Sequence, residues 1–294
     1  MSRNPRAVRL AKQMGIPYAE ALRQIRDPES TLIQADDSDH LLDLFGQRPG
    51  SGPVASGLAG FDELTSGLEQ GNVVVFAGVS SSGLSTALFT IASHVAVQQQ
   101  VSAMWVEGKS PVGLVAERMV SGLAQVNRTR FADPSLSGDE AGRVRAATAR
   151  LKRSPLWIRD GLRTVAAVEQ ALRAAPQMPR VLILDEVRHF DHVRAGMSSE
   201  EHLTELGVLL KHLAMRLKIT ICMAHRVEVL PAREPMYAED LFPFAAVSDK
   251  LILLRTERGL DGQARTQMHL EKSRTSRLGK FSVTPRFEFA RFES

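Results

Sequence analysis

The stretch "NVVVFAGVSSSGLSTALFT", residues 72–90, decides the fold. It starts with a continuous β-branched and aromatic run, which is typical of a strand buried on both faces of a parallel sheet. It ends with apolar residues at helical spacing. Between them, "GVSSSGLST" (78–86) has the spacing of the phosphate-binding motif G-x-x-x-x-G-K-[ST]. The order of strand, glycine-rich loop and helix predicts an anion site at the helix N-terminus.

The loop keeps Gly78, Gly83 and Ser85 of this motif, but its lysine position holds Leu84. Glycines let backbone N–H groups wrap phosphates, and the Ser85 hydroxyl is placed to bind Mg²⁺. ATP and Mg²⁺ are therefore the expected cofactors. The expected contact residues are Gly78, Ser80, Ser81, Ser82, Gly83, Leu84, Ser85 and Thr86. A Gly/Ser-rich turn that binds no ligand is the alternative interpretation.

Leu84 removes the point charge that the lysine of such a loop places against the β- and γ-phosphates. Backbone amides do not fully replace that charge. We expect turnover to fall by orders of magnitude unless another cation takes its place, and Lys109 is the nearest candidate in sequence.

After this stretch, apolar strand-like runs alternate with segments of helical spacing. Strands are expected at 101–108, 155–160, 180–187 and 219–225, and helices at 111–125, 165–175 and 201–218. Buried strands separated by helices predict an α/β fold with a mainly parallel sheet. From residue 249 the helical pattern stops, and residues 266–274 and 280–292 predict closing antiparallel strands.

The 294-residue chain has 44% apolar residues and a net charge of +4, which indicates a globular protein and permits an anionic partner. We expect a helical N-terminal extension at 1–46, a flexible Gly/Pro/Ser-rich linker at 47–56 and the main domain at 57–294. The single cysteine, Cys222, lies in an apolar run and excludes an intrachain disulfide. No apolar run is long enough to span a membrane, so a cytoplasmic protein is expected.

Two carboxylates end buried strands after the loop. Asp185 follows four apolar residues in "VLILDEV", at the strand end where parallel sheets bind ligands, and could hold Mg²⁺ directly or through water. Glu107 ends the preceding strand "AMWVEG" and could activate a water that attacks a γ-phosphate. Each alone is equally typical of a solvated strand end, and their order after the loop favours the catalytic interpretation.

The run "EKSRTSRLGK" (271–280) is strongly basic. Most such runs are simple hairpin turns. Lys272 and Arg274 could instead be presented to a neighbouring subunit's γ-phosphate, because cations stabilise the charge that develops in phosphoryl transfer.

Taken in order, these motifs resemble the C-terminal motor domain of DnaB-type replicative DNA helicases, a RecA-like P-loop fold. The similarity covers residues 53–294 and runs through "SGLAGFDELTSGLEQGNVVVFAG", "WVEGKSPVGLVAERM", "LILDEVRHF", "ITICMAHR" and "EKSRTSRLG". It implies Glu107 as the water-activating base and Asp185 as the Walker B acid. It also implies His225 at the position of a γ-phosphate-sensing glutamine, with Lys272 and Arg274 as a trans-acting finger.

The resemblance further implies a ring, expected to be a hexamer, with nucleotide between subunits and single-stranded DNA in the centre. Replication proteins are then expected partners. The candidate DNA phosphate contacts are Arg188, Arg194, Arg226 and Arg233, each of which could equally be a solvated surface arginine. Residues 40–45, "HLLDLF", could form a linker helix that docks on the next subunit.

The sequence departs from the family at several positions. Besides Leu84, a short apolar stretch, "DLFPFAAVS" (240–248), stands where the family has an Arg-Glu-containing DNA-binding loop. Only about 50 residues precede the linker, so a helicase collar and its primase docking are not expected. Three functions stay open: a DNA motor of reduced activity, a pseudo-ATPase that regulates a partner, and a RecA- or KaiC-like ATPase outside replication.

Overall fold

The computed structural model describes residues 52–133, 135–191, 195–227, 244–259 and 263–293. The chain divides into two units, Met1–Gly52 and Pro53–Ser294, and the second contains all the elements described below. The helices predicted within 1–46 and residues 47–51 of the linker predicted at 47–56 lie outside the described residues, so these boundaries stay predictions.

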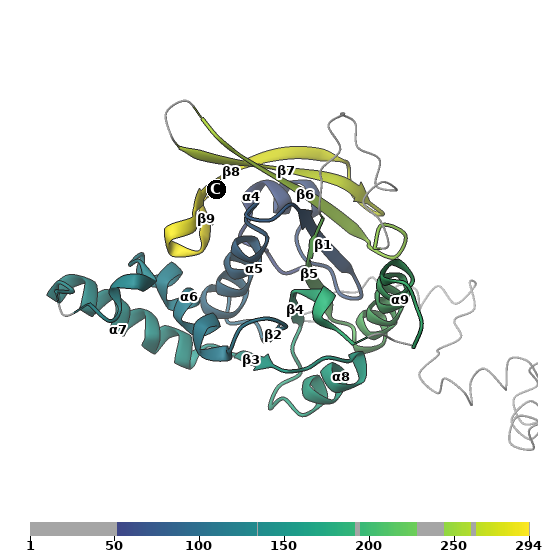
Figure 1. Cartoon of the computed structure of the whole chain (residues 1–294), viewed down its shortest axis with the longest axis horizontal. Coiled ribbons are helices and arrows are strands. Elements are labelled where there is room, and N and C mark those ends of the chain that lie inside the picture. The colour runs from purple at the N-terminus through teal and green to yellow at the C-terminus, as the bar shows by residue number, and fades with distance from the viewer. Residues whose placement is uncertain (1–51, 134, 192–194, 228–243, 260–262, 294) are drawn as a thin grey trace, which may run out of the picture. The chain divides into compact units, whose positions relative to one another are not determined.

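A nine-stranded sheet forms the centre of the domain, in the order β3-β2-β4-β5-β1-β6-β7-β8-β9 (Figure 1). The first six strands in this order are parallel, and the last three pair antiparallel at one edge. The predicted α/β class, with a mainly parallel RecA-like sheet and closing antiparallel strands, is confirmed. The strands are β1 (Val73–Gly78), β2 (Ala103–Glu107), β3 (Leu156–Asp160), β4 (Val181–Asp185), β5 (Thr220–Arg226), β6 (Lys250–Arg258), β7 (Ala264–Ser273), β8 (Gly279–Arg286) and β9 (Arg291–Glu293).

Helices cover both faces of the sheet. The α-helices are α4 (Ala59–Thr65), α5 (Leu84–Ala92), α6 (Val112–Ala124), α7 (Gly138–Arg153), α8 (Val165–Arg173) and α9 (Ser199–Leu217). Successive side chains of a strand point to opposite faces. In β1, Val74 and Phe76 accordingly pack in the core under α5 and α6, whereas Val73 and Val75 pack in the core under α8 and α9.

Four short helical segments also occur within the described residues. A π-helical segment, η1 (Ser93–Gln98), continues α5, and three 3₁₀ turns occur at η2 (Arg128–Arg130), η3 (Val187–His189) and η5 (Phe287–Phe289). No described helix is long and apolar enough to cross a membrane. The cysteine of β5, Cys222, is fully buried, and burial raises the pKa of its thiol to about 12, as expected for a core thiol.

The parallel strands carry the candidate site at their carboxyl ends. The register places Glu107 at the end of β2 opposite Asp185 at the end of β4, and Ala77 of β1 opposite His225 of β5. Loops far apart in sequence therefore meet at one edge of the sheet, which is the place where open α/β sheets bind ligands.

Candidate nucleotide-binding site

The loop between β1 and α5 has the backbone of an anion-binding turn. Ser81 and Gly83 have positive φ angles of 66° and 97°, and the Ser82 N–H donates to the Val79 carbonyl at 3.2 Å. No side chain caps the N-terminus of α5. Backbone N–H groups of the loop and of the first helical turn are therefore available to an anion, with the positive end of the helix dipole behind them.

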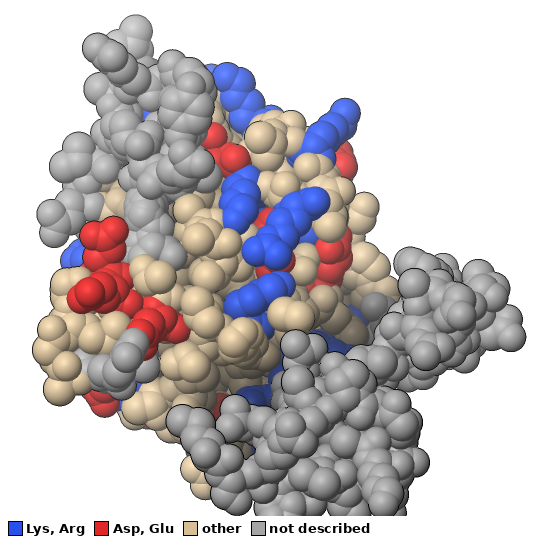
Figure 2. Space-filling view, turned by 90° about the vertical axis from the view of Figure 1, so that its right-hand side faces the viewer, with Lys and Arg blue, Asp and Glu red and all other residues tan. Residues whose placement is uncertain are grey.

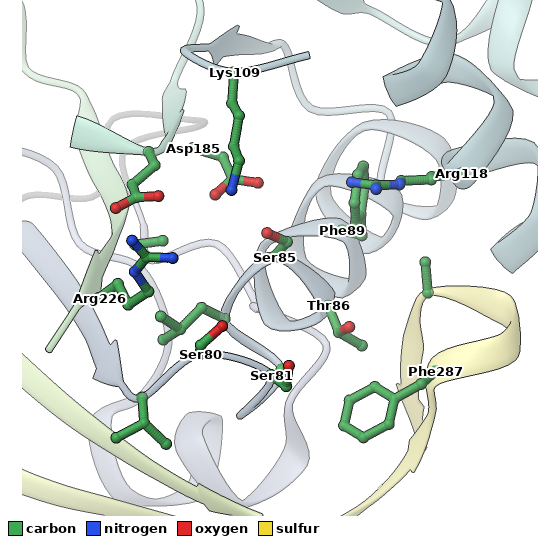
Figure 3. A pocket seen from close by; sticks show the side chains of 16 residues that line it. Ser80, Ser81, Ser85, Thr86, Phe89, Lys109, Arg118, Asp185, Arg226 and Phe287 are labelled. Atoms are coloured by element: carbon green, nitrogen blue, oxygen red, sulfur yellow. The ribbon is translucent and has the colours of Figure 1, made fainter. Parts of the chain in front are cut away.

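A cavity of about 490 Å³ lies beside this loop (Figure 3). It is lined by Val79, Ser80, Ser81, Gly83, Leu84, Ser85, Thr86, Phe89, Lys109, Arg118, Asp185, Glu186, Ala224, Arg226, Phe287 and Ala290. Six of the eight loop residues predicted to contact nucleotide line it. The other two do not: Gly78 ends β1, and the buried Ser82 hydroxyl sits close to Gly78 beneath the loop.

Asp185 lines the cavity from the end of β4, and its side chain is largely buried. The pKa of the Asp185 carboxyl is raised from 3.8 to about 7, chiefly by burial and in smaller part by the negative charge of Glu107, whereas hydrogen bonding from Ser85 opposes the rise. Figure 3 shows Asp185 above Ser85 on the same side of the pocket. Two oxygen donors next to a phosphate loop fit Mg²⁺, which usually takes one or two protein ligands and completes its shell with phosphate and water.

Glu107 is 3% exposed and does not line the cavity itself. Its Oε2 accepts a hydrogen bond from the Trp105 indole at 3.1 Å. Its Oε1 accepts backbone N–H groups of Lys109 and Ser110, at 3.1 and 3.0 Å. These three donors fix the carboxylate beside Asp185, where its charge acts on the Asp185 proton.

Two consecutive residues at the end of β5 do not lie where the sequence predicted. His225, expected at the γ-phosphate, does not line the cavity; its ring packs edge-on against Phe244 with the centroids 5.1 Å apart. Burial and the nearby Arg188 lower the pKa of His225 to about 4, so the ring is neutral at neutral pH. Arg226, expected at DNA, lines the cavity beside the 78–86 loop instead (Figure 3).

Lys272 and Arg274 lie away from the cavity of their own chain. The Lys272 ammonium donates to the Ala245 carbonyl and, at 3.3 Å, to that of Ala246. Burial and the charge of Arg274 lower the pKa of Lys272. The Arg274 guanidinium lies 3.5 Å from the buried carboxylate of Asp249.

Asp249 was missed by sequence reasoning, although it anchors this region. Its carboxylate accepts the backbone N–H of Val73 at 2.8 Å and pairs with Lys211 of α9 at 2.7 Å. Its carbonyl accepts the backbone N–H of Arg274 at 3.1 Å. The only available signal was an aspartate that directly precedes an apolar strand.

Of the four arginines proposed as DNA contacts, Arg188 and Arg226 lie within the described residues. Arg188 pairs with Glu186 at 2.6 Å, Arg226 lines the nucleotide cavity, and Arg194 and Arg233 lie outside the described residues. On the face shown in Figure 2, basic side chains are interleaved with acidic ones over the described surface.

The cavity also has an apolar wall that sequence reasoning missed. Phe89 of α5 meets the C-terminal residues Phe287 and Ala290 there. Phe287 is 40% exposed and lies edge-on to Phe292, with ring centroids 6.2 Å apart. An exposed aromatic ring beside a phosphate loop offers a surface on which a nucleobase or sugar can pack.

A family model described as "DnaB-like helicase C terminal domain" matches residues 53–294. The replicative DNA helicase DnaB of Treponema pallidum is 22% identical over 246 residues, which cover 81% of this chain and 55% of the relative. The chain thus spans about half the length of this curated relative.

Solved structures share the fold. One of them, an isolated ATPase domain, has a TM-score of 0.78 at 14% identity, covering 88% of this chain and 99% of that one. A DnaB-like replicative helicase, studied with its interactions with primase, also has a TM-score of 0.78, at 16% identity with 97% and 74% coverage. A KaiC-like protein of Pyrococcus horikoshii has a TM-score of 0.54, at 14% identity with 79% and 93% coverage.

Proposed function

The chain belongs to the family of DnaB-like helicase C-terminal domains, and from this premise we propose that it is an ATP-binding DNA motor of reduced turnover. The observation that carries the proposal is the cavity, which gathers the 78–85 loop, Asp185 and several cations at the carboxyl edge of the sheet. A nucleoside triphosphate fits this combination, because anion-binding amides and a metal-binding carboxylate adjoin an apolar wall.

In this proposal, Ser85 and Asp185 hold Mg²⁺, which when bound neutralises phosphate charge. The loop amides hold the phosphates. Glu107 orients the attacking water and accepts its proton, a role that suits a carboxylate fixed by three hydrogen bonds next to the metal-binding acid. The Phe287 side of the cavity takes the nucleoside.

Lys272 and Arg274 act on a neighbouring subunit's nucleotide in the same proposal. Both lie outside the cavity of their own chain, as a trans-acting pair requires. A ring, with six subunits as the expected number, then places nucleotide at each interface and single-stranded DNA in the centre. The family and the DnaB-like relatives support DNA replication as the setting, with replication proteins as partners.

A pseudo-ATPase that binds a partner without turnover is the second candidate, and Leu84 is the observation that favours it. The experiment that separates the two is ATP hydrolysis by the wild type, Leu84→Lys and Glu107→Ala, each with and without single-stranded DNA. The motor predicts DNA-stimulated turnover that Glu107→Ala abolishes and Leu84→Lys increases. Turnover absent from the wild type but present in Leu84→Lys supports the pseudo-ATPase.

A further inference from the structure

Position 84 leaves the phosphate loop without its own cation. Leu84 begins α5 and packs partly buried against the core, so it lines the cavity with hydrocarbon. A triphosphate bound beside it would still require a nearby positive charge, because several negative oxygens converge in a partly enclosed site. Among the described residues, the cations that line the cavity are Lys109, Arg118 and Arg226.

Lys109 stands on a turn that is fixed to the metal-binding strand end. The Gly108 N–H donates to the Asp185 carbonyl at 2.7 Å. A Cβ atom at Gly108 would lie 2.9 Å from the Glu186 carbonyl, so the turn and the end of β4 approach as closely as only glycine permits. The Lys109 N–H is itself bonded to Glu107. These hydrogen bonds therefore fix the position of the Lys109 backbone relative to Glu107 and to the strand end that carries Asp185.

The Lys109 side chain is exposed and enters the cavity. In Figure 3 it extends from the turn after β2 toward Asp185 and Ser85, the side of the pocket where the metal and terminal phosphates belong. Its ammonium forms no ion pair within the described part of the chain. It is consequently available to a phosphate, and removing it breaks no hydrogen bond or ion pair of the Lys109 side chain among the described residues.

The other two cations of the cavity, Arg118 and Arg226, enter it from other elements than Lys109 does. Arg118 projects from α6 beside Phe89, where its positive charge acts on the Asp185 carboxyl, and it also lines a second cavity with Arg150. Arg226 enters from the end of β5. Neither stands on a turn tied to Asp185.

We propose that Lys109 supplies, from the turn after β2, the positive charge against the β- and γ-phosphates that a phosphate loop ordinarily takes from its own lysine. A lysine suits this role because its ammonium is a compact point charge on a flexible stem, which can reach a phosphate from a new backbone position. The inference rests on the proposed function, since it concerns the same nucleotide.

The test is titration calorimetry of the full chain with Mg-ATP, Mg-ADP and AMP. The variants are Lys109→Ala, Lys109→Arg, Leu84→Lys, the double variant Leu84→Lys with Lys109→Ala, Arg118→Ala and Arg226→Ala. Lys152→Ala, which removes an exposed lysine of α7 away from the cavity, is the matched control. Thermal unfolding of each variant checks that the fold is kept.

We expect Lys109→Ala to weaken Mg-ATP binding about tenfold or more, the usual scale for losing one charge-assisted contact. AMP lacks the β- and γ-phosphates, so its affinity should change less than about twofold. Lys109→Arg should keep most of the ATP affinity. In the Leu84→Lys background, Lys109→Ala should cost little, because the loop has regained its own cation.

Equal Mg-ATP affinity of the wild type and Lys109→Ala would overturn the inference. So would equal losses for ATP and AMP, which indicate a general change of the pocket. A phosphate-specific loss in Arg118→Ala or Arg226→Ala, without one in Lys109→Ala, would assign the charge to that arginine instead. If Leu84→Lys binds Mg-ATP and the wild type does not, no other residue replaces the missing lysine. Failure of every variant to bind ATP would contradict the proposed function itself.

Discussion

Asp185 is a residue whose ionisation is changed strongly by its surroundings. Its pKa is about 7 in the folded chain against an ordinary 3.8, chiefly because the carboxyl is buried. Below about pH 4 the group is protonated in both the folded and unfolded states and contributes nothing. Above pH 7 it is ionised in both, and the folded state carries the full desolvation penalty. This carboxyl therefore lowers stability as the pH rises from 4 to 7.

Asp185→Asn should remove that penalty. We expect the free energy of unfolding of the variant to exceed that of the wild type increasingly from pH 4 to 7, by at most about 4 kcal/mol at pH 8. Urea titrations across this pH range measure the difference. Glu257→Gln, at an exposed position late in β6, is the control and should leave the profile unchanged. A constant difference across the pH range would disprove the raised pKa.

Gly83 sets the shape of the phosphate loop. Its φ angle is 97°, and an added Cβ would lie 2.7 Å from the Phe292 ring. Gly83→Ala should therefore destabilise the domain by about 1–3 kcal/mol and abolish nucleotide binding. Gly113→Ala, in α6 where the Cβ meets open space, should instead be neutral or stabilising by up to about 1 kcal/mol. Chemical denaturation of both variants checks the contrast, and equal effects would refute it.

The end of β5 shows where residue-scale prediction from sequence fails. A strand pattern predicts that His225 and Arg226 point to opposite faces, but it does not say which face carries the ligand. The packing of His225 against Phe244 determines which of the two residues faces the cavity. Phe244 is nineteen positions further along the chain, so the local pattern of β5 could not predict this contact. The phosphate loop and Asp185 were predictable because their motifs are local and end at a strand terminus.

At the scale of elements, the apolar stretch in place of the family's DNA-binding loop has a structural role in its described part. Phe244 and Ala245 are buried in the core under α9, and residues 240–243 lie outside the described residues. A Cβ at Gly207 of α9 would lie 2.6 Å from Val247 and 3.1 Å from Phe244. The glycine thus lets this segment pack closely on the helix.

Gly207→Ala tests this packing. In an exposed helix the change would stabilise by roughly 0.5–1 kcal/mol. Here we expect it to destabilise by about 1–3 kcal/mol, because the methyl group overpacks the contact with Val247. The penalty should shrink in a Val247→Ala background, as measured by a double-mutant cycle of unfolding free energies. Stabilisation by Gly207→Ala in both backgrounds would mean that the segment does not pack there.

The strands were predictable because each is a continuous apolar run, and all five parallel strands expected from β1 to β5 are present. Helices α4 and α7 fall outside the elements predicted from residue patterns. In α7 the only buried residue is Ala147, so an apolar stripe hardly exists. A capping box between Ser137 and Glu140 starts this helix, and contacts with α6 complete a small core. Such a helix depends on its cap and neighbour more than on its own periodicity.

At the scale of the whole molecule, one catalytic site of the proposed motor requires two chains. Glu107 belongs to the cavity's own chain, whereas Lys272 and Arg274 are held by the 245–249 segment away from it. To reach a neighbour's phosphate, Lys272 and Arg274 must leave these contacts. The phosphate carries more negative charge than the groups they leave, and arginine binds phosphate strongly through paired, charge-assisted hydrogen bonds.

Mixing subunits tests this arrangement. Glu107→Ala and Arg274→Ala should each lack turnover, and a mixture of the two should recover it, because about one interface in four then combines an intact Glu107 with an intact Arg274. ATP hydrolysis by the mixed proteins is the measurement, made in a Leu84→Lys background if wild-type turnover is too slow. Action in trans would be contradicted if the mixture hydrolyses ATP no faster than either variant alone while the protein without these two substitutions is active.

The central claim is that this cavity binds Mg-nucleotide although its loop lacks a lysine. Equilibrium titration of the wild type with ATP, with and without Mg²⁺, tests it most directly. We expect saturable binding that Mg²⁺ strengthens about tenfold or more, and loss of this enhancement in Asp185→Asn. Absence of saturable binding up to millimolar ATP, or an Mg²⁺ effect unchanged in Asp185→Asn, would contradict the claim.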